Sequence, residues 1–262
     1  MSSDWSSDVC SSDLLDYEYS AGLDLKYGID ESFTLDMILI PDFGQKKSDE
    51  TVLNLSPYEV RYDEKRPFFT EGTELFNKAG LFYSRRVGGE PSGYQQLGSK
   101  LREGERIIDN PREAELINAT KVSGRNDQGL GLGLFNAMAS NTYATVKDSV
   151  GNTRKILTQP FTNYNMMVVD KNFGQNSYLN VINTNYYQPK TGRIENVTGS
   201  AYKVSDRTNH YAFWGNAAYS LQKDSSAGQF TSGQYIEASL GKVSGNFRFN
   251  YHLNLLTDAY EH

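Results

Sequence analysis

The sequence predicts an all-β chain whose antiparallel strands belong to a transmembrane β-barrel. Apolar and polar residues alternate through most of residues 20–256, the pattern of strands with one apolar and one wet face. Many of these segments reach about 9 to 11 residues, the length of a tilted strand that crosses a bilayer. Their polar positions are rich in Asn, Gln, Ser and Thr, and aromatic residues recur near their ends. These features favour a water-filled barrel over a soluble all-β domain, which stays the alternative.

The composition narrows the function classes. The 262 residues include 32 Asp and Glu against 26 Lys and Arg, so the net charge of -6 argues against non-specific nucleic-acid binding. The 18 Tyr and 13 Phe argue against disorder. The single cysteine and three histidines lack metal-ligand spacing, so we predict no metal and no cofactor. A mean hydropathy of -0.59 is compatible with a barrel, because half of each strand is polar.

Residues 1–14 are interpreted as non-native. From Asp4 to Leu14 the sequence DWSSDVCSSDL matches the conceptual translation of a widely used sequencing-library adapter. On this interpretation Cys10 has no biological role. We therefore expect a fragment of about ten strands, whose native N-terminus lies upstream and whose C-terminus is also truncated.

Residues 15–44 contain the first predicted hairpin. Two alternating segments flank a turn at residues 28–32. The apolar face of the two strands comprises Leu23, Leu25, Tyr27, Phe33, Leu35, Met37 and Leu39.

Residues 45–111 form a charged, Gly-rich region that is predicted to be a loop or plug, and they hold the candidate site. Its residues are Glu59, Arg61, Glu64, Lys65, Arg66, Pro67, Phe68, Phe69, Glu71, Arg85 and Arg86. Because opposite charges are closely interleaved, we expect ion pairs that brace or plug a lumen. Paired carboxylates can also hydrolyse glycosides at the right separation, which makes Glu64 and Glu71 weak catalytic candidates. For Phe68 and Phe69 we favour packing over sugar stacking.

Residues 112–262 are predicted to hold the remaining barrel strands. The strands are expected at residues 117–124, 129–139, 163–170, 176–187, 211–221, 234–241 and 246–256, with a further apolar stretch at Tyr202 and Val204. The run that begins at Gly129 alternates Gly with Leu but lacks the spacing of a nucleotide-binding loop. We expect its leucines to face lipid and its glycines to face a crowded lumen.

Several motifs resemble one family of Gram-negative proteins. They are Ile40-Pro-Asp-Phe-Gly-Gln, Glu64-Lys-Arg-Pro-Phe-Phe-Thr-Glu-Gly, Leu81-Phe-Tyr-Ser-Arg-Arg, Thr120-Lys-Val-Ser-Gly-Arg and Gln159-Pro-Phe-Thr-Asn-Tyr. Members of that family carry an N-terminal family 9 carbohydrate-binding module followed by a domain of unknown function that is read as an outer-membrane β-barrel. The module would lie upstream of residue 15 and is absent here.

The resemblance implies a location in the outer membrane, with membrane lipid as a partner and a glycan as ligand. We therefore expect a binding or transport component, linked to glycans through the missing module, rather than an enzyme. The alternative is a carbohydrate-active hydrolase that uses carboxylates of residues 59–74.

Overall fold

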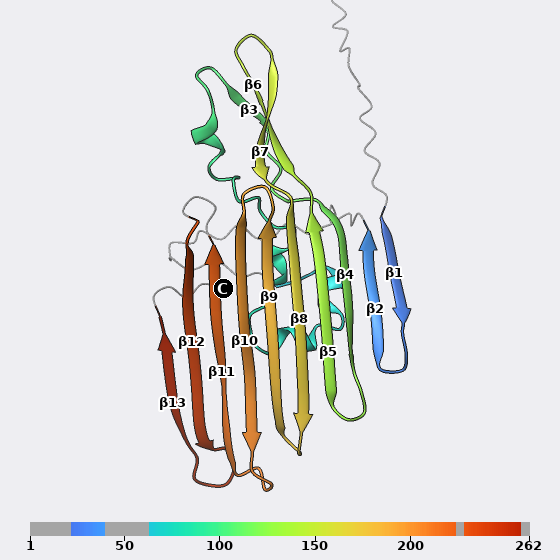
Figure 1. Ribbon diagram of the computed structural model, residues 1–262, viewed down its shortest axis with the longest axis vertical. Coiled ribbons are helices and arrows are strands. Elements are labelled where there is room, and N and C mark those ends of the chain that lie inside the picture. Colours follow the sequence, from blue (N-terminus) through green and yellow to red (C-terminus); the bar gives the residue numbers. More distant parts are fainter. Residues whose placement is uncertain (1–21, 40–62, 224–227, 258–262) are drawn as a thin grey trace, which may run out of the picture.

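The computed structural model describes residues 22–39, 63–223 and 228–257 (Figure 1). In this part of the chain one ten-stranded antiparallel sheet and one three-stranded sheet account for most of the regular structure, and the helices are short. The predicted antiparallel all-β class is therefore confirmed. Residues 1–14, interpreted above as non-native, lie outside the described residues, so their origin stays a prediction.

The ten-stranded sheet is built mainly from neighbours in sequence. In pairing order its strands are β1 (Leu23–Gly28), β2 (Phe33–Leu39), β4 (Leu116–Arg125), β5 (Leu130–Ala139), β8 (Thr162–Phe173), β9 (Ser177–Gln188), β10 (Arg193–Ser205), β11 (Tyr211–Lys223), β12 (Phe230–Lys242) and β13 (Phe249–Leu256). Strands β8 to β12 have 12 or 13 residues each. Within the described residues the sheet stays open, with β1 and β13 as its edges (Figure 1).

A smaller sheet extends beyond one end of the large one (Figure 1). It consists of β3 (Arg106–Asp109), β6 (Thr142–Lys147) and β7 (Thr153–Gln159), with the 3-10 turn η2 (Leu97–Lys100) packed on it. Leu97, Ala144, Val146 and Ile156 form its separate core. The sequence did not predict these strands, because β3 has only four residues and the residues of β6 and β7 do not alternate regularly between apolar and polar.

Residues 63–92 cover one face of the large sheet, here called the inner face, while the opposite face is called the outer face. This inward segment contains the short helices α1 (Pro67–Thr70) and α2 (Glu74–Asn77) and the 3-10 turn η1 (Ser84–Arg86). Figure 1 shows the segment against β4, β5, β8 and β9. The main core lies between them and includes Phe68, Phe69, Leu75, Phe76, Phe135, Ala137, Met166, Val168 and Ile182.

Strand β5 confirms the predicted contrast between leucine and glycine faces. A Cβ atom added to Gly131 would lie 2.8 Å from Leu75 Cδ2, and one added to Gly133 would lie 2.8 Å from Phe76 Cζ. Leu132 and Leu134 point to the outer face instead and are 42% and 53% exposed. The glycines therefore let α2 approach the sheet closely, as strand glycines commonly do.

The outer face presents exposed apolar side chains on every strand of the described sheet except β4, and on β10 the exposed example is Val204 near the end of the strand. Its large exposed residues include Leu25, Tyr27, Leu39, Leu132, Leu134, Met167, Val169, Leu179, Val181, Phe213, Tyr219, Ile236, Leu240, Tyr251, Leu253 and Leu255. Among the described residues, none of the helices has the length and apolar character needed to cross a membrane.

Candidate functional site

Glu64 and Arg66 form the centre of the predicted charged cluster. The Arg66 guanidinium donates from Nε to Glu64 Oε1 at 2.8 Å and from Nη2 to Glu64 Oε2 at 2.7 Å. Both side chains are largely buried, with 4% of Arg66 and 12% of Glu64 exposed. Ser84 Oγ also donates to Glu64 Oε2 at 2.5 Å. The pair therefore connects the start of α1 to η1.

Arg66 holds the turn around η1 through further contacts. Its Nη1 donates to the carbonyl of Val87 at 2.8 Å, and its Nη2 donates to the carbonyl of Ser84 at 2.7 Å. The guanidinium also lies over the Phe69 ring, 4.0 Å from its centroid. The planar guanidinium thus satisfies a carboxylate and two carbonyl groups while stacking on an aromatic face, which a lysine could not do.

These contacts determine the protonation of Glu64. Burial alone would raise the pKa of Glu64, but hydrogen bonds from the Arg66 side chain, the Ser84 hydroxyl and the Arg66 backbone lower it from 4.5 to about 2. Glu64 is therefore ionised at neutral pH. A general acid in glycoside hydrolysis must supply a proton, so this environment suits a structural carboxylate better than a catalytic acid.

Glu71, the second catalytic candidate, lies at the surface. Its carboxylate accepts a hydrogen bond from Lys26 Nζ of β1 at 2.8 Å, and both side chains are about 60% exposed. This hydrogen bond lowers the pKa of Glu71. The contact joins the inward segment to the edge of the sheet.

Of the remaining predicted site residues that the structure describes, some are buried in the core and others lie at or near the surface. Pro67 is the first residue of α1, and Phe68 and Phe69 are buried against Phe135 at ring-centroid distances of 6.3 Å and 5.9 Å. Lys65 is exposed, and its backbone N–H donates to Glu64. Arg85 donates to the carbonyl of Asp63 and lies 4.0 Å from the Glu64 carboxylate, whereas Arg86 is exposed beside Tyr83. Glu59 and Arg61 lie outside the described residues.

Two charged side chains on the inner face, which the sequence reasoning did not single out, anchor the inward segment. Lys121 of β4 donates from Nζ to the carbonyls of Phe68 at 2.9 Å and Glu71 at 2.5 Å, and it lies 3.4 Å from Asp36 of β2. It therefore binds the C-terminal end of α1, where free carbonyl groups favour a cation.

Asp170 of β8 is the second anchor and has no exposed surface. Its carboxylate forms ion pairs with Lys78 Nζ at 2.9 Å and Arg125 Nη2 at 2.5 Å, and it accepts a hydrogen bond from Asn180 Nδ2 at 3.2 Å. Asn180 also donates to the carbonyl of Leu75 at 3.2 Å. A charge beside apolar residues on the same strand face, Ala119 next to Lys121 and Val168 next to Asp170, was the sequence signal that could have revealed both anchors, because buried charges require partners.

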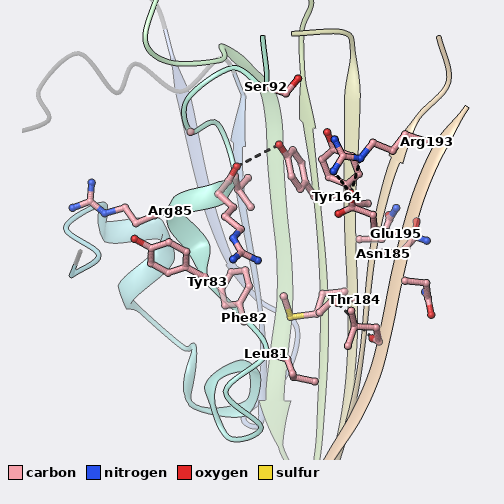
Figure 2. A pocket seen from close by; sticks show the side chains of 18 of the residues that line it. Leu81, Phe82, Tyr83, Arg85, Ser92, Tyr164, Thr184, Asn185, Arg193 and Glu195 are labelled. Carbon is pink, nitrogen blue, oxygen red and sulfur yellow. Dashed lines mark hydrogen bonds and ion pairs between the residues drawn. The ribbon is translucent and has the colours of Figure 1, made fainter. Parts of the chain in front are cut away.

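A hollow of about 740 Å³ lies between residues 81–92 of the inward segment and the inner face of β8 to β11. Figure 2 shows Leu81 and Phe82 toward one end of it and Ser92, Tyr164 and Arg193 toward the other. Tyr164 donates through its hydroxyl to the carbonyl of Arg86 at 3.3 Å (Figure 2). The hollow thus combines an apolar end with an end rich in hydrogen-bonding groups.

Its polar end is formed by aromatic rings and a pair of opposite charges. The rings of Tyr164 and Tyr186 meet edge to face with centroids 5.5 Å apart, and the Arg193 guanidinium lies 5.6 Å from the Tyr186 centroid. Arg193 is ion-paired with Glu195. The lining as a whole carries mixed charges, with four arginines and three glutamates, and so offers many hydrogen-bond donors and acceptors. The volume is in the usual range for small-molecule sites.

In the described part of the chain, no three His, Cys, Asp or Glu side chains are grouped as a metal ion would require.

Comparison with known proteins gives one result. Residues 4–262 match a family described as a domain of unknown function, DUF5916. No curated protein and no solved structure gives a significant match. The match covers nearly the whole chain, and its description mentions neither an outer membrane nor a carbohydrate-binding module.

Proposed function

We propose that this chain, which belongs to the DUF5916 family, forms part of an outer-membrane β-barrel that binds or transports solutes, glycans among them. The observation that carries the proposal is the contrast between the two faces of the large sheet. Monomeric soluble proteins rarely expose contiguous apolar patches larger than a few hundred Å². Here exposed apolar side chains extend from β1 to β13 on the outer face. A bilayer is the solvent that such a face fits.

The inner face supports the same proposal because, beyond the apolar core under the inward segment, it carries polar side chains as a lumen does. Where the inward segment covers it, Lys121 and Asp170 are matched by partners of that segment. Farther along, Glu237 of β12 accepts from the Tyr235 hydroxyl at 2.8 Å and from the Asn216 amide at 3.1 Å. A polar wall with an inward-folded segment is a known arrangement in barrels of this kind.

Closure of the barrel requires new pairing at both sheet edges. The outward backbone groups of β1 and β13 have no neighbouring strand in the described part of the chain. In a bilayer every such group needs a hydrogen-bonding partner, so an open edge is not viable there. The proposal therefore requires that further strands, or pairing between the two edges, complete the ring.

The hollow beside residues 81–92 is the proposed solute site. Sugars carry hydroxyl groups that both donate and accept, together with apolar C–H faces that pack on aromatic rings. Tyr164, Tyr186 and the neutral Arg193–Glu195 pair offer these partners. This chemistry supports a neutral glycan and does not depend on the upstream module expected from the family resemblance.

The proposal is tested on the intact protein in its native membrane. We expect it to fractionate with the outer membrane and to change its electrophoretic mobility on heating, because folded barrels resist detergent and run compactly until boiled. A matched soluble periplasmic protein should show neither behaviour. Recovery of the intact protein as a soluble, monodisperse species without detergent would refute the barrel and favour the soluble all-β alternative.

A further inference from the structure

The outer face carries one polar patch within its apolar surroundings. The patch consists of Asn136 of β5, Asn163 and Asn165 of β8, Asn183 and Asn185 of β9, and Asn196 and Thr198 of β10. Strand pairing aligns Asn136, Asn165, Asn185 and Asn196 in a single row across these four strands. Six asparagines and one threonine thus replace the apolar residues expected at these positions.

Hydrogen bonds within the patch satisfy only part of its capacity. Asn136 Nδ2 donates to Asn163 Oδ1 and to Asn165 Oδ1, both at 2.8 Å. Asn183 Nδ2 donates to Asn196 Oδ1 at 3.0 Å and to Thr198 Oγ1 at 2.7 Å. A primary amide offers two N–H donors and two acceptor lone pairs. Seven polar side chains so close together therefore present groups that can bind another surface.

The patch is also hollowed and bordered by apolar side chains. A depression of about 420 Å³ is lined by Asn136, Asn165 and Asn183 together with Leu134 and Met167. Leu134 and Met167 are each more than half exposed. A partner that packs here would therefore meet a polar centre with an apolar border. This arrangement suits a contact within a membrane, because polar side chains can hydrogen-bond across the contact while the apolar border faces lipid.

Because hydrocarbon offers no hydrogen-bonding partner, a patch of amides facing lipid is costly. This inference rests on the proposed membrane location. We propose that the polar patch is the contact surface between two copies of this chain. Amides donate and accept equally, so the patch is complementary to itself, as a two-fold interface requires. Its residues are all uncharged, so two copies meet without repulsion and a strongly charged partner gains no ion pair.

The first test is cross-linking in native outer membranes. In a cysteine-free background of the intact protein, Asn183→Cys places a thiol within the patch. A short bis-maleimide should then yield a covalent dimer of this variant. Leu240→Cys is the matched control, because Leu240 is an exposed outer-face residue of β12 outside the patch. Equal dimer yields from the two variants, or none from Asn183→Cys, would overturn the inference.

The second test replaces the polar centre by leucine. The triple variant Asn136→Leu, Asn165→Leu and Asn183→Leu makes the patch compatible with lipid. We expect its dimer dissociation constant in mild detergent to rise at least tenfold, while the heat-dependent mobility shift is retained. A wild-type protein that is monomeric yet heat-modifiable overturns the contact between copies alone. A protein that shows no heat-dependent shift and stays soluble without detergent overturns the barrel as well.

Discussion

The Glu64–Arg66 pair allows a decisive test of what the charged cluster does. Glu64→Gln removes the negative charge and puts an amide N–H₂ against the Arg66 guanidinium, which can only donate. Arg66 is 4% exposed, so its charge then loses the Glu64 carboxylate in a nearly dry site. Breaking a buried pair by removing one partner is strongly destabilising. We expect the inward segment to open more readily than in the wild type.

The size of the effect follows from the protonation of Glu64. A pKa lowered from 4.5 to about 2 corresponds to about 3 kcal/mol in favour of the folded, ionised state. Solvent at the exposed edge of the carboxylate reduces this to about 2 kcal/mol. Since 1.4 kcal/mol is a factor of ten, the open population should rise roughly 30-fold.

Limited proteolysis of the intact protein measures this population, because cleavage between residues 63 and 92 requires opening when closing is fast. Glu71→Gln is the matched control, since Glu71 is exposed and its loss should leave the cleavage rate nearly unchanged. An unchanged rate for Glu64→Gln would refute the bracing role. If both variants instead lost glycoside turnover while the cleavage rates stayed at wild-type values, the hydrolase alternative would be favoured.

Four further predictions concern the sheet, the pH response, the two faces and the hollow. Gly133→Val should raise the cleavage rate of the inward segment, because overpacking against Phe76 costs about 1–3 kcal/mol, whereas Gly98→Ala, with open space around it, should not. Glu64 and Glu105, whose pKa values are both lowered to about 2, form ion pairs with Arg66 and Arg154. The protection from proteolysis that these pairs give should be complete above about pH 4.5 and should fall toward pH 2, where the carboxylates become protonated. Pepsin cleavage at a series of pH values measures this protection. A water-soluble maleimide should label His252→Cys but not Leu253→Cys in membranes, because adjacent residues of β13 face opposite sides; equal labelling would contradict the barrel. Tyr186→Ala should weaken binding of neutral hexasaccharides, measured by calorimetry, at least tenfold, while Tyr143→Ala on β6 should not; equal binding by both variants would remove the hollow as the solute site.

Most strands of the large sheet could be predicted from the sequence, because their outer-face residues are apolar and alternate with polar residues along each strand. Strand β10 is the instructive exception. Only Tyr202 and Val204 were recognised, yet the strand begins at Arg193. Its outward positions include Asn196 and Thr198, which belong to the polar patch, so the apolar half of the alternation is missing there. A strand that serves a second polar contact therefore looks like a loop in sequence.

The candidate site was predicted less completely, because its parts come from distant segments. The interleaved charges of residues 63–86 correctly indicated ion pairing, and Glu64–Arg66 is such a pair. The anchors Lys121 and Asp170 could not be matched to their partners, which lie about 50 and 90 residues away along the chain. Likewise the hollow depends on β8 to β11 meeting residues 81–92, a contact that local periodicity does not encode.

The two anchors explain why the inward segment packs on the sheet at one place. Lys121 binds the end of α1, and Asp170 forms an ion pair with Lys78 just after α2. Gly131 and Gly133 leave room for α2 between these points. A segment fixed on β4, β5, β8 and the start of β9 leaves the inner face of β10 and β11 less covered, and the hollow opens there. The position of the proposed solute site is thus a consequence of the charges that brace the segment.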